Sequence, residues 1–260
     1  MKKILLIVSI PVLVSSAFAF SASDDASNYG GGWTASSNGG SGFGSWSLSN
    51  NDVGVPSGPY AGNFIGNSTD GTGNINTGTN QSFGMYANPA TAFSSATRSF
   101  STVLTTNDQF TVNLGVNFDN GFKGFNLLSG GSTVVGFQVG GGARILTDNT
   151  DNATTAVYNY GGGDALLQAV IQVINLGRVD YEISRISSSG SQGVLFAGSI
   201  TGITGSIDSF EFYVNNTEDG AAANNLYFNS LSVSEVPEPS TYSWIAGALS
   251  LSYVLRRRRS

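Results

Sequence analysis

The stretch QFTVNLGVNF, residues 109–118, decides the fold class. Phenylalanine, valine and leucine occupy every second position from Phe110 to Phe118, and polar or small residues fill the positions between them. This period of two is typical of a half-buried β-strand, because successive side chains of a strand point to opposite faces of the sheet. The sequence therefore predicts a strand with one face in a hydrophobic core.

A turn signal follows this strand directly. The triplet DNG at 119–121 favours the positive backbone φ angles of a tight turn. We therefore predict that residues 122–128 form the returning strand of a hairpin. The glycine pair at 130–131 predicts a second turn, which leads into another strand over residues 133–139.

Further alternating runs extend this pattern to the end of the body of the chain. They lie at residues 179–183, 210–214 and 227–233. Residues 164–176 fit both the helical and the strand period, and their valine, isoleucine and glutamine favour a strand. Short strands separated by glycine and asparagine turns predict an all-β fold, an antiparallel two-sheet β-sandwich.

We assign this sandwich to residues 20–236, a length that one all-β domain commonly has. The glycine- and serine-rich start of the body, residues 20–44, is predicted to be flexible.

Charge excludes one class of partner. All 17 acidic residues lie between Asp24 and Glu238, where only five of the 11 basic residues are found. This stretch therefore carries a net charge near −12. Binding to a nucleic acid requires clustered lysine and arginine to neutralise phosphates. We therefore expect no nucleic-acid partner.

The chain contains no histidine and no cysteine. Nucleophilic triads that use histidine as the base are therefore excluded, and so are metal sites with histidine or cysteine ligands. Without disulfides, the core has to be held by packing alone.

Residues 1–19 have the three parts of a secretory signal peptide. Two lysines form the basic start, an apolar stretch covers residues 4–14, and Ala17 and Ala19 form the small-residue site that signal peptidase recognises. The apolar stretch is too short to span a membrane. We therefore expect the chain to be exported and the segment to be removed.

The C-terminal end has three features in a fixed order. Pro237, Glu238 and Pro239 come first, and an apolar segment follows over residues 242–255. The last feature is a cluster of Arg256, Arg257, Arg258 and Arg259. As a helix the apolar segment would be roughly 21 Å long, which is short for a transmembrane helix. The arginines would stay on the cytoplasmic side and stop translocation.

This order of features resembles the PEP-CTERM sorting signal, over about the last tenth of the chain. The resemblance implies that an exosortase in the membrane recognises the tail, cuts near Pro237-Glu238-Pro239 and passes the body to the cell surface or extracellular matrix. It also implies a bacterium that makes exopolysaccharide, and hence a place in a biofilm matrix. Serines dilute the apolar segment, which suits a transient anchor.

The order of the predicted strands resembles the jelly-roll sandwich of concanavalin-like lectins and glucanases, at the level of the fold only. Glucanases of that fold carry a catalytic Glu-x-Asp-x-(x)-Glu strand. Here Ser206 occupies the position of the first glutamate, before Asp208 and Glu211. A regular strand would also send those two carboxylates to opposite faces. We therefore expect them to face solvent and predict no catalytic residues.

Two loop segments are candidate binding sites. The oxygens of Asp148, Asp151 and Asn152 suit a hard cation such as Ca²⁺, although the same residue types form ordinary turns. Glu218 and Asp219 form a smaller cluster of this kind.

Aromatic side chains supply the second kind of candidate site. The rings of Tyr158 and Tyr160 are candidates for stacking on a sugar, with loop packing as the alternative. Among the other aromatic residues, Trp46 and Tyr181 are predicted to lie in the core. The glycine runs lack the lysine of a phosphate-binding loop and are explained as turns.

Three hypotheses for the body follow from these observations. The first is a non-enzymatic surface or matrix protein with a structural or adhesive role, associated with exopolysaccharide. The second is a lectin-like carbohydrate-binding module that depends on calcium. The third is a polysaccharide hydrolase, which requires two carboxylates about 5–10 Å apart in a cleft.

Overall fold

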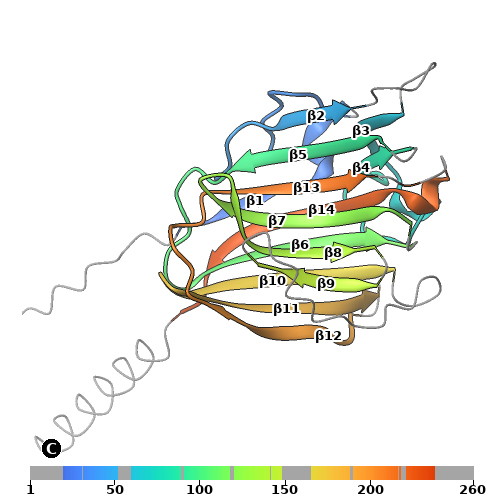
Figure 1. The fold of residues 1–260 in the computed structure, drawn as a ribbon. Helices are drawn as coiled ribbons and strands as arrows, with labels where there is room; N and C mark the ends of the chain where they lie inside the picture. The colour runs from blue at the N-terminus through green and yellow to red at the C-terminus, as the bar shows by residue number, and fades with distance from the viewer. Residues whose placement is uncertain are drawn as a thin grey trace, which may run out of the picture.

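The protein folds as an all-β sandwich of two antiparallel sheets. The computed structural model describes residues 20–30, 32–51, 60–88, 91–117, 120–140, 142–147, 165–187, 190–215, 217 and 221–237. Within them, fourteen strands form one sheet of eight strands and one of six, and these stack face to face (Figure 1). We call them the large sheet and the small sheet.

The large sheet has the order β12-β11-β10-β6-β14-β4-β3, and β1 also pairs with β14. Its strands are β1 (Ala22–Asp24), β3 (Ala61–Gly66), β4 (Ser82–Ala87), β6 (Asp108–Val116), β10 (Leu166–Asn175), β11 (Arg178–Ser187), β12 (Gly190–Thr201) and β14 (Leu226–Glu235). The large sheet thus ends in β12 on one side and β3 on the other.

The small sheet has the order β2-β5-β13-β7-β8-β9. Its strands are β2 (Ser47–Asn51), β5 (Phe93–Ser99), β7 (Phe122–Ser129), β8 (Ser132–Val139), β9 (Ala143–Leu146) and β13 (Ser209–Asn215). Three short 3-10 helices lie in the connections, η1 (Ala26–Tyr29), η2 (Ser68–Asp70) and η3 (Ala222–Asn224).

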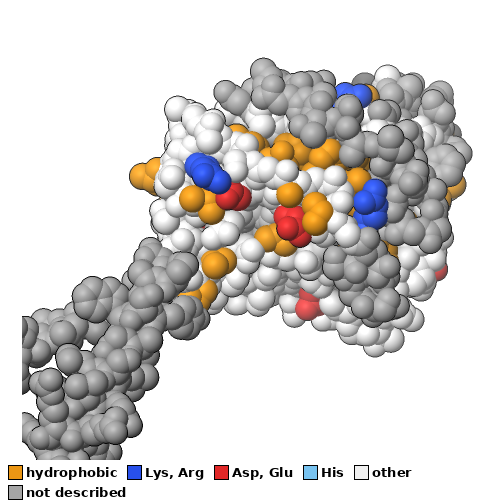
Figure 2. Space-filling model, turned by 90° about the horizontal axis from the view of Figure 1, so that it is seen from below, with side chains coloured by type: hydrophobic (Ala, Val, Ile, Leu, Met, Phe, Trp, Pro, Cys, Tyr) orange, Lys and Arg blue, Asp and Glu red, His pale blue; other side chains and the backbone are white. Residues whose placement is uncertain are grey.

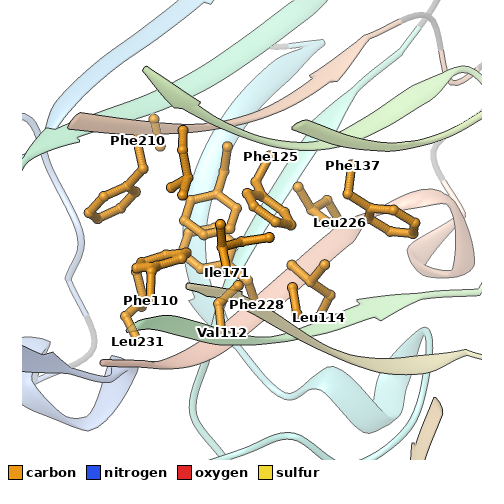
Figure 3. Packing of buried hydrophobic residues seen from close by; sticks show 14 of the residues in the cluster. Phe110, Val112, Leu114, Phe125, Phe137, Ile171, Phe210, Leu226, Phe228 and Leu231 are labelled. Atoms are coloured by element: carbon orange, nitrogen blue, oxygen red, sulfur yellow. The ribbon is translucent and has the colours of Figure 1, made fainter. Parts of the chain in front are cut away.

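Aromatic rings from both sheets fill the space between them. Figure 3 shows Phe210 and Phe125 on one side facing Phe110 on the other. The tightest contact is between Phe212 of β13 and Phe228 of β14, whose rings stack with centroids 3.7 Å apart and planes 5° from parallel. All of these side chains are fully buried, so the hydrophobic effect holds the two sheets together.

The period-two pattern predicted the strands themselves correctly. β6 (Asp108–Val116) covers most of the predicted strand at 109–118, of which Phe118 lies outside the described residues, and the later runs correspond to β11, β13 and β14. The segment left open between helix and strand is the strand β10. The glycine pair at 130–131 joins β7 to β8 in an antiparallel hairpin, as predicted, and both glycines have positive φ.

The hairpin predicted between residues 109–118 and 122–128 is wrong. β6 pairs with β10 and β14 in the large sheet, whereas β7 pairs with β13 and β8 in the small sheet. The chain crosses from one sheet to the other between them, so Phe110 and Phe125 meet through the core, with centroids 6.3 Å apart. The two apolar faces bury more surface by facing each other than they would side by side.

The glycine- and serine-rich start of the body is packed against the sheets, contrary to the expected flexibility. Trp33 and Phe43 are both buried, and Trp33 contacts Trp46 edge to face at 5.2 Å. Bridges tie Ser41 to β1 and Phe43 to the residue after β5. A few large aromatic side chains thus order a segment whose average composition predicted a linker.

A buried ion pair joins the two sheets at this end of the sandwich. Asp24 of β1 accepts a hydrogen bond from the guanidinium group of Arg98 on β5, and both side chains are fully buried. The Tyr29 hydroxyl also donates to Asp24 and accepts from the Trp46 indole at 2.9 Å. Burial and the bond to Asp24 raise the pKa of Tyr29 to about 12.

Candidate functional site

A cleft opens at one corner of the sandwich, where the ends of β8, β9 and β12 approach the β7–β8 turn. Its volume is about 630 Å³. Figure 2 views the molecule from the side on which β12 lies, where acidic and basic side chains are scattered among hydrophobic ones. The lining comes from both sheets and from the segment after β12, so it exists only in the folded chain.

The described residues that line the cleft carry no charge. Hydroxyl groups come from Ser129, Ser132, Thr133, Thr147, Tyr181, Ser199, Thr201 and Thr204. The remaining lining residues are Val134, Ile145, Ile200, Gly202 and Ile203. Such a mixture of hydroxyl and aliphatic groups suits a neutral ligand that has both polar and apolar faces.

Tyr181 supplies the aromatic ring of the cleft. It lies on β11, directly opposite Gly198 of β12. A Cβ atom at Gly198 would be 2.6 Å from the Tyr181 hydroxyl oxygen and 2.9 Å from the ring carbon that bears it. The phenol end therefore lies over the glycine, in space that any other residue at position 198 would occupy.

This position corrects one prediction, since Tyr181 was expected in the core. The side chain packs against the core but remains partly exposed in the cleft. Trp46 is buried in the core, as predicted.

One hydroxyl on the cleft rim is held in a polar network. Arg178 binds Asp180 through two hydrogen bonds of 2.8 and 3.0 Å. Ser199 donates to Asp180 at 2.6 Å and accepts from Arg178 at 3.0 Å. The hydrogen bond from Arg178 holds the pKa of Asp180 below its usual value, so the network stays charged at neutral pH.

The rim after β12 depends on glycine backbone geometry. Gly202 and Gly205 have φ angles of 80° and 104°, which other residues rarely adopt. A Cβ atom at Gly205 would also lie 2.4 Å from the hydroxyl of Ser129. These two glycines therefore let the segment pass close to the β7–β8 turn and close that side of the cleft.

The two carboxylates weighed as a catalytic pair belong to different networks. Asp208 precedes β13 and accepts from the backbone amide of Gly130 at 2.7 Å. Glu211 lies on the outer face of the small sheet, where its Oε2 accepts a hydrogen bond from Nδ2 of Asn126 at 3.4 Å. Partial burial raises the pKa of this carboxyl group. Neither residue lines the cleft. Asp208 and Glu211 are both partly exposed, and Glu211 lies on the solvent-facing side of the small sheet, as expected.

Most of the site residues predicted from the sequence lie outside the described residues. These are Ala17, Ala19, Asp148, Asp151, Asn152, Tyr158, Tyr160, Glu238, Pro239 and Arg256 to Arg259. Pro237 is described and exposed. In the described ranges, no three acidic side chains gather in a group that could hold a metal ion. Among the same residues, no helix has the length and apolar character needed to cross a membrane.

The sequence analysis missed the cleft. Its parts come from segments more than 70 residues apart, between Ser129 and Thr204, and none has a distinctive local motif. The only local signal was Gly198, one of three glycines in β12. Such a glycine often marks close approach by another group.

Comparisons with known proteins give structural neighbours only. No family model and no curated protein matches the chain. A sialidase structure aligns with a TM-score of 0.42 and 10% identity over 60% of this chain, which spans only 16% of the sialidase. The cellulose-induced protein Cip1 aligns at 0.44 and 10% identity, covering 72% of this chain and 90% of Cip1.

The exoplasmic/lumenal domain of VIP36, in a form bound to Ca²⁺ and Man3GlcNAc, aligns at 0.41 and 10% identity. The alignment covers 76% of this chain and 87% of that domain. TM-scores this low carry no argument about function. The description of the fold therefore rests on the strands of this chain and their pairing.

Proposed function

We propose that this protein is a non-enzymatic surface protein that binds neutral polysaccharide in the cleft beside Tyr181. In this proposal signal peptidase removes residues 1–19 and the tail at 242–255 holds the exported chain in the membrane. An exosortase then processes it near Pro237-Glu238-Pro239. The body remains at the cell surface or in the extracellular matrix, where its role is structural or adhesive.

The uncharged cleft is the observation that carries the binding proposal. A sugar ring presents C–H groups on its faces and hydroxyls around its edge. The Tyr181 ring and the aliphatic side chains suit the faces, and the serine and threonine hydroxyls suit the edge.

Charge supports a neutral ligand over an acidic one. The described lining contains no arginine or lysine. The stretch from Asp24 to Glu238 carries a net charge near −12, which repels uronic acids and sulfated sugars at low ionic strength. Acidic polysaccharides should therefore bind more weakly than neutral ones of similar size.

The decisive experiment is calorimetric titration of residues 20–236 with a panel of neutral and acidic polysaccharides that includes the host's exopolysaccharide. We expect saturable binding of a neutral polymer, weakened at least about tenfold by Tyr181→Ala through loss of stacking. Tyr86→Ala is the matched control, because Tyr86 is a partly exposed tyrosine on the outer face of the large sheet. Equal binding by the wild type and Tyr181→Ala would refute the cleft as the site.

Two further arms of the titration separate the alternatives. Loss of binding with a chelator would point to the calcium-dependent lectin and to the loop of Asp148, Asp151 and Asn152. Release of reducing sugar ends during incubation would point to a hydrolase. The proposal expects neither result.

The sorting step has its own test. Replacement of Glu238 and both neighbouring prolines by alanine should leave the unprocessed chain in the membrane fraction. A shorter chain in the extracellular fraction despite the replacement would contradict exosortase recognition at this motif.

A further inference from the structure

β12 is a long strand at one edge of the large sheet. β12 pairs with β11, and no described strand pairs with its other side. It has twelve residues, whereas the other outermost strands, β3, β2 and β9, have six, five and four. Its sequence contains no charged residue and no proline, the two features that usually prevent a strand edge from pairing.

Only the second half of β12 is regular enough to accept another strand. The register with β11 shifts twice over the first half, between Ile183 and Ser184 and between Arg185 and Ile186. Such bulges protect an edge. From Phe196 to Thr201 the register is uninterrupted. The accessible edge is therefore this six-residue segment.

We propose that this edge pairs with the same edge of a second copy of the chain. The partner is argued from symmetry about Gly198. If two antiparallel copies of β12 are related by a two-fold axis through Gly198, Phe196 of each copy lies opposite Ile200 of the other. Ala197 of each copy then lies opposite Ser199 of the other. Aromatic and β-branched side chains are a favourable cross-strand pair. One surface that is complementary to itself is what a two-fold dimer needs.

The neutral edge also explains how two acidic bodies can meet. The nearest described ionic side chains lie on β11, one strand behind the joint, where Arg178 and Asp180 neutralise each other and the carboxylate of Glu182 lies opposite Ala197. The pairing segment itself therefore brings no like charges together across the joint.

The pairing would also bring the two candidate sites together. Tyr181 lies over Gly198 in each copy, so the two phenol groups would lean towards each other across the joint. A dimer would thus carry two clefts on one continuous sheet and would bind a long polymer bivalently. This last consequence rests on the proposed function, whereas the pairing itself does not.

The test uses the full chain in its own cells, and the absence of cysteine in the sequence removes any background. Two tagged versions are co-expressed, one with Ala197→Cys and one with Ser199→Cys. Residues opposite each other on neighbouring strands have Cα atoms about 4.5–5.5 Å apart, a separation at which a disulfide forms. Both positions are exposed, so neither substitution disturbs the core.

We expect disulfide-linked dimers that contain both tags, at least about tenfold more abundant than those from either version alone. Ser47→Cys with Ser49→Cys is the matched control, on the short exposed edge strand β2. Absence of the mixed dimer would overturn the proposal. Equal amounts of mixed dimer at β12 and β2 would also overturn it, because random collision would then explain both.

A second variant tests the contact without cysteine. Ala197→Lys places a charge on the pairing edge, and Ser49→Lys places the same charge on β2. In chemical cross-linking of the full chain, the first should abolish the dimer and the second should leave it. A dimer that survives Ala197→Lys would show association through another surface. Because these assays measure contact between two copies of the chain and not polysaccharide binding, their failure is distinct from failure of the binding proposal.

Discussion

Replacement of Arg98 by methionine should be among the most damaging single changes in this protein. The guanidinium group is fully buried and binds Asp24, the side chain of Asn38 at 2.7 Å and the carbonyls of Gly39 and Gly44. Methionine fills part of the space but provides no donor. Breaking a buried ion pair by removing one partner costs about 3–5 kcal/mol.

The contacts left behind place the cost within that range. The partly buried carbonyls of Gly39 and Gly44 lose a charged donor, and an acceptor left without a partner costs about 1–3 kcal/mol when it is fully buried. Asp24 keeps the backbone amide of Asp25 at 2.9 Å and Asn28 at 2.8 Å, which limits the penalty on the carboxylate. We therefore expect Arg98→Met to lower the free energy of unfolding by about 4 kcal/mol.

The assay is urea unfolding followed by the fluorescence of the buried tryptophans, with linear extrapolation to water. Arg178→Met is the control, because Arg178 also pairs with an aspartate, Asp180, but both side chains are over a third exposed. Exposed pairs contribute about 0–1 kcal/mol. A loss below about 1 kcal/mol for Arg98→Met, or equal losses for both variants, would refute the argument that this pair joins the sheets.

Three other predictions follow from single contacts. Gly198→Ala should push the flexible end of Tyr181 aside and weaken polysaccharide binding about tenfold with little loss of stability, as measured by calorimetry and urea unfolding. Gly177→Ala should change neither, because its Cβ atom would make only an ordinary contact with Asn175, at 3.6 Å. Phe212→Ala should lower the free energy of unfolding by about 3–5 kcal/mol in the same urea assay, because it removes the ring stacked between the sheets. The raised pKa of Tyr29 means that its contribution to stability is fully present below pH 10 and is lost as the pH rises through about 12. Unfolding measured as a function of pH should show this loss in the wild type and a smaller loss in Tyr29→Phe.

Local pattern was enough to locate most strands. The alternation in residues 109–118 and 227–233 predicted β6 and β14, because a strand that buries one face needs an apolar side chain at every second position. Local pattern did not predict correctly which strands pair with each other. The DNG triplet at 119–121 predicted a hairpin, yet the same turn chemistry also serves a crossing between sheets, and the choice between them is made by burial across the core.

The two ends and the body differ in how far sequence determines them. The signal peptide predicted at residues 1–19 and the sorting tail predicted at 237–260 are proposals drawn from linear sequence patterns, so the route proposed for the protein rests on the sequence alone. The cleft, in contrast, depends on residues that only folding brings together. Tyr181 lines the cleft only because β11 and β12 place Gly198 opposite its ring. The other hydroxyl groups of the cleft come from both sheets. Only the tertiary structure decides such a site, because the distances that create it join residues that are far apart in the chain.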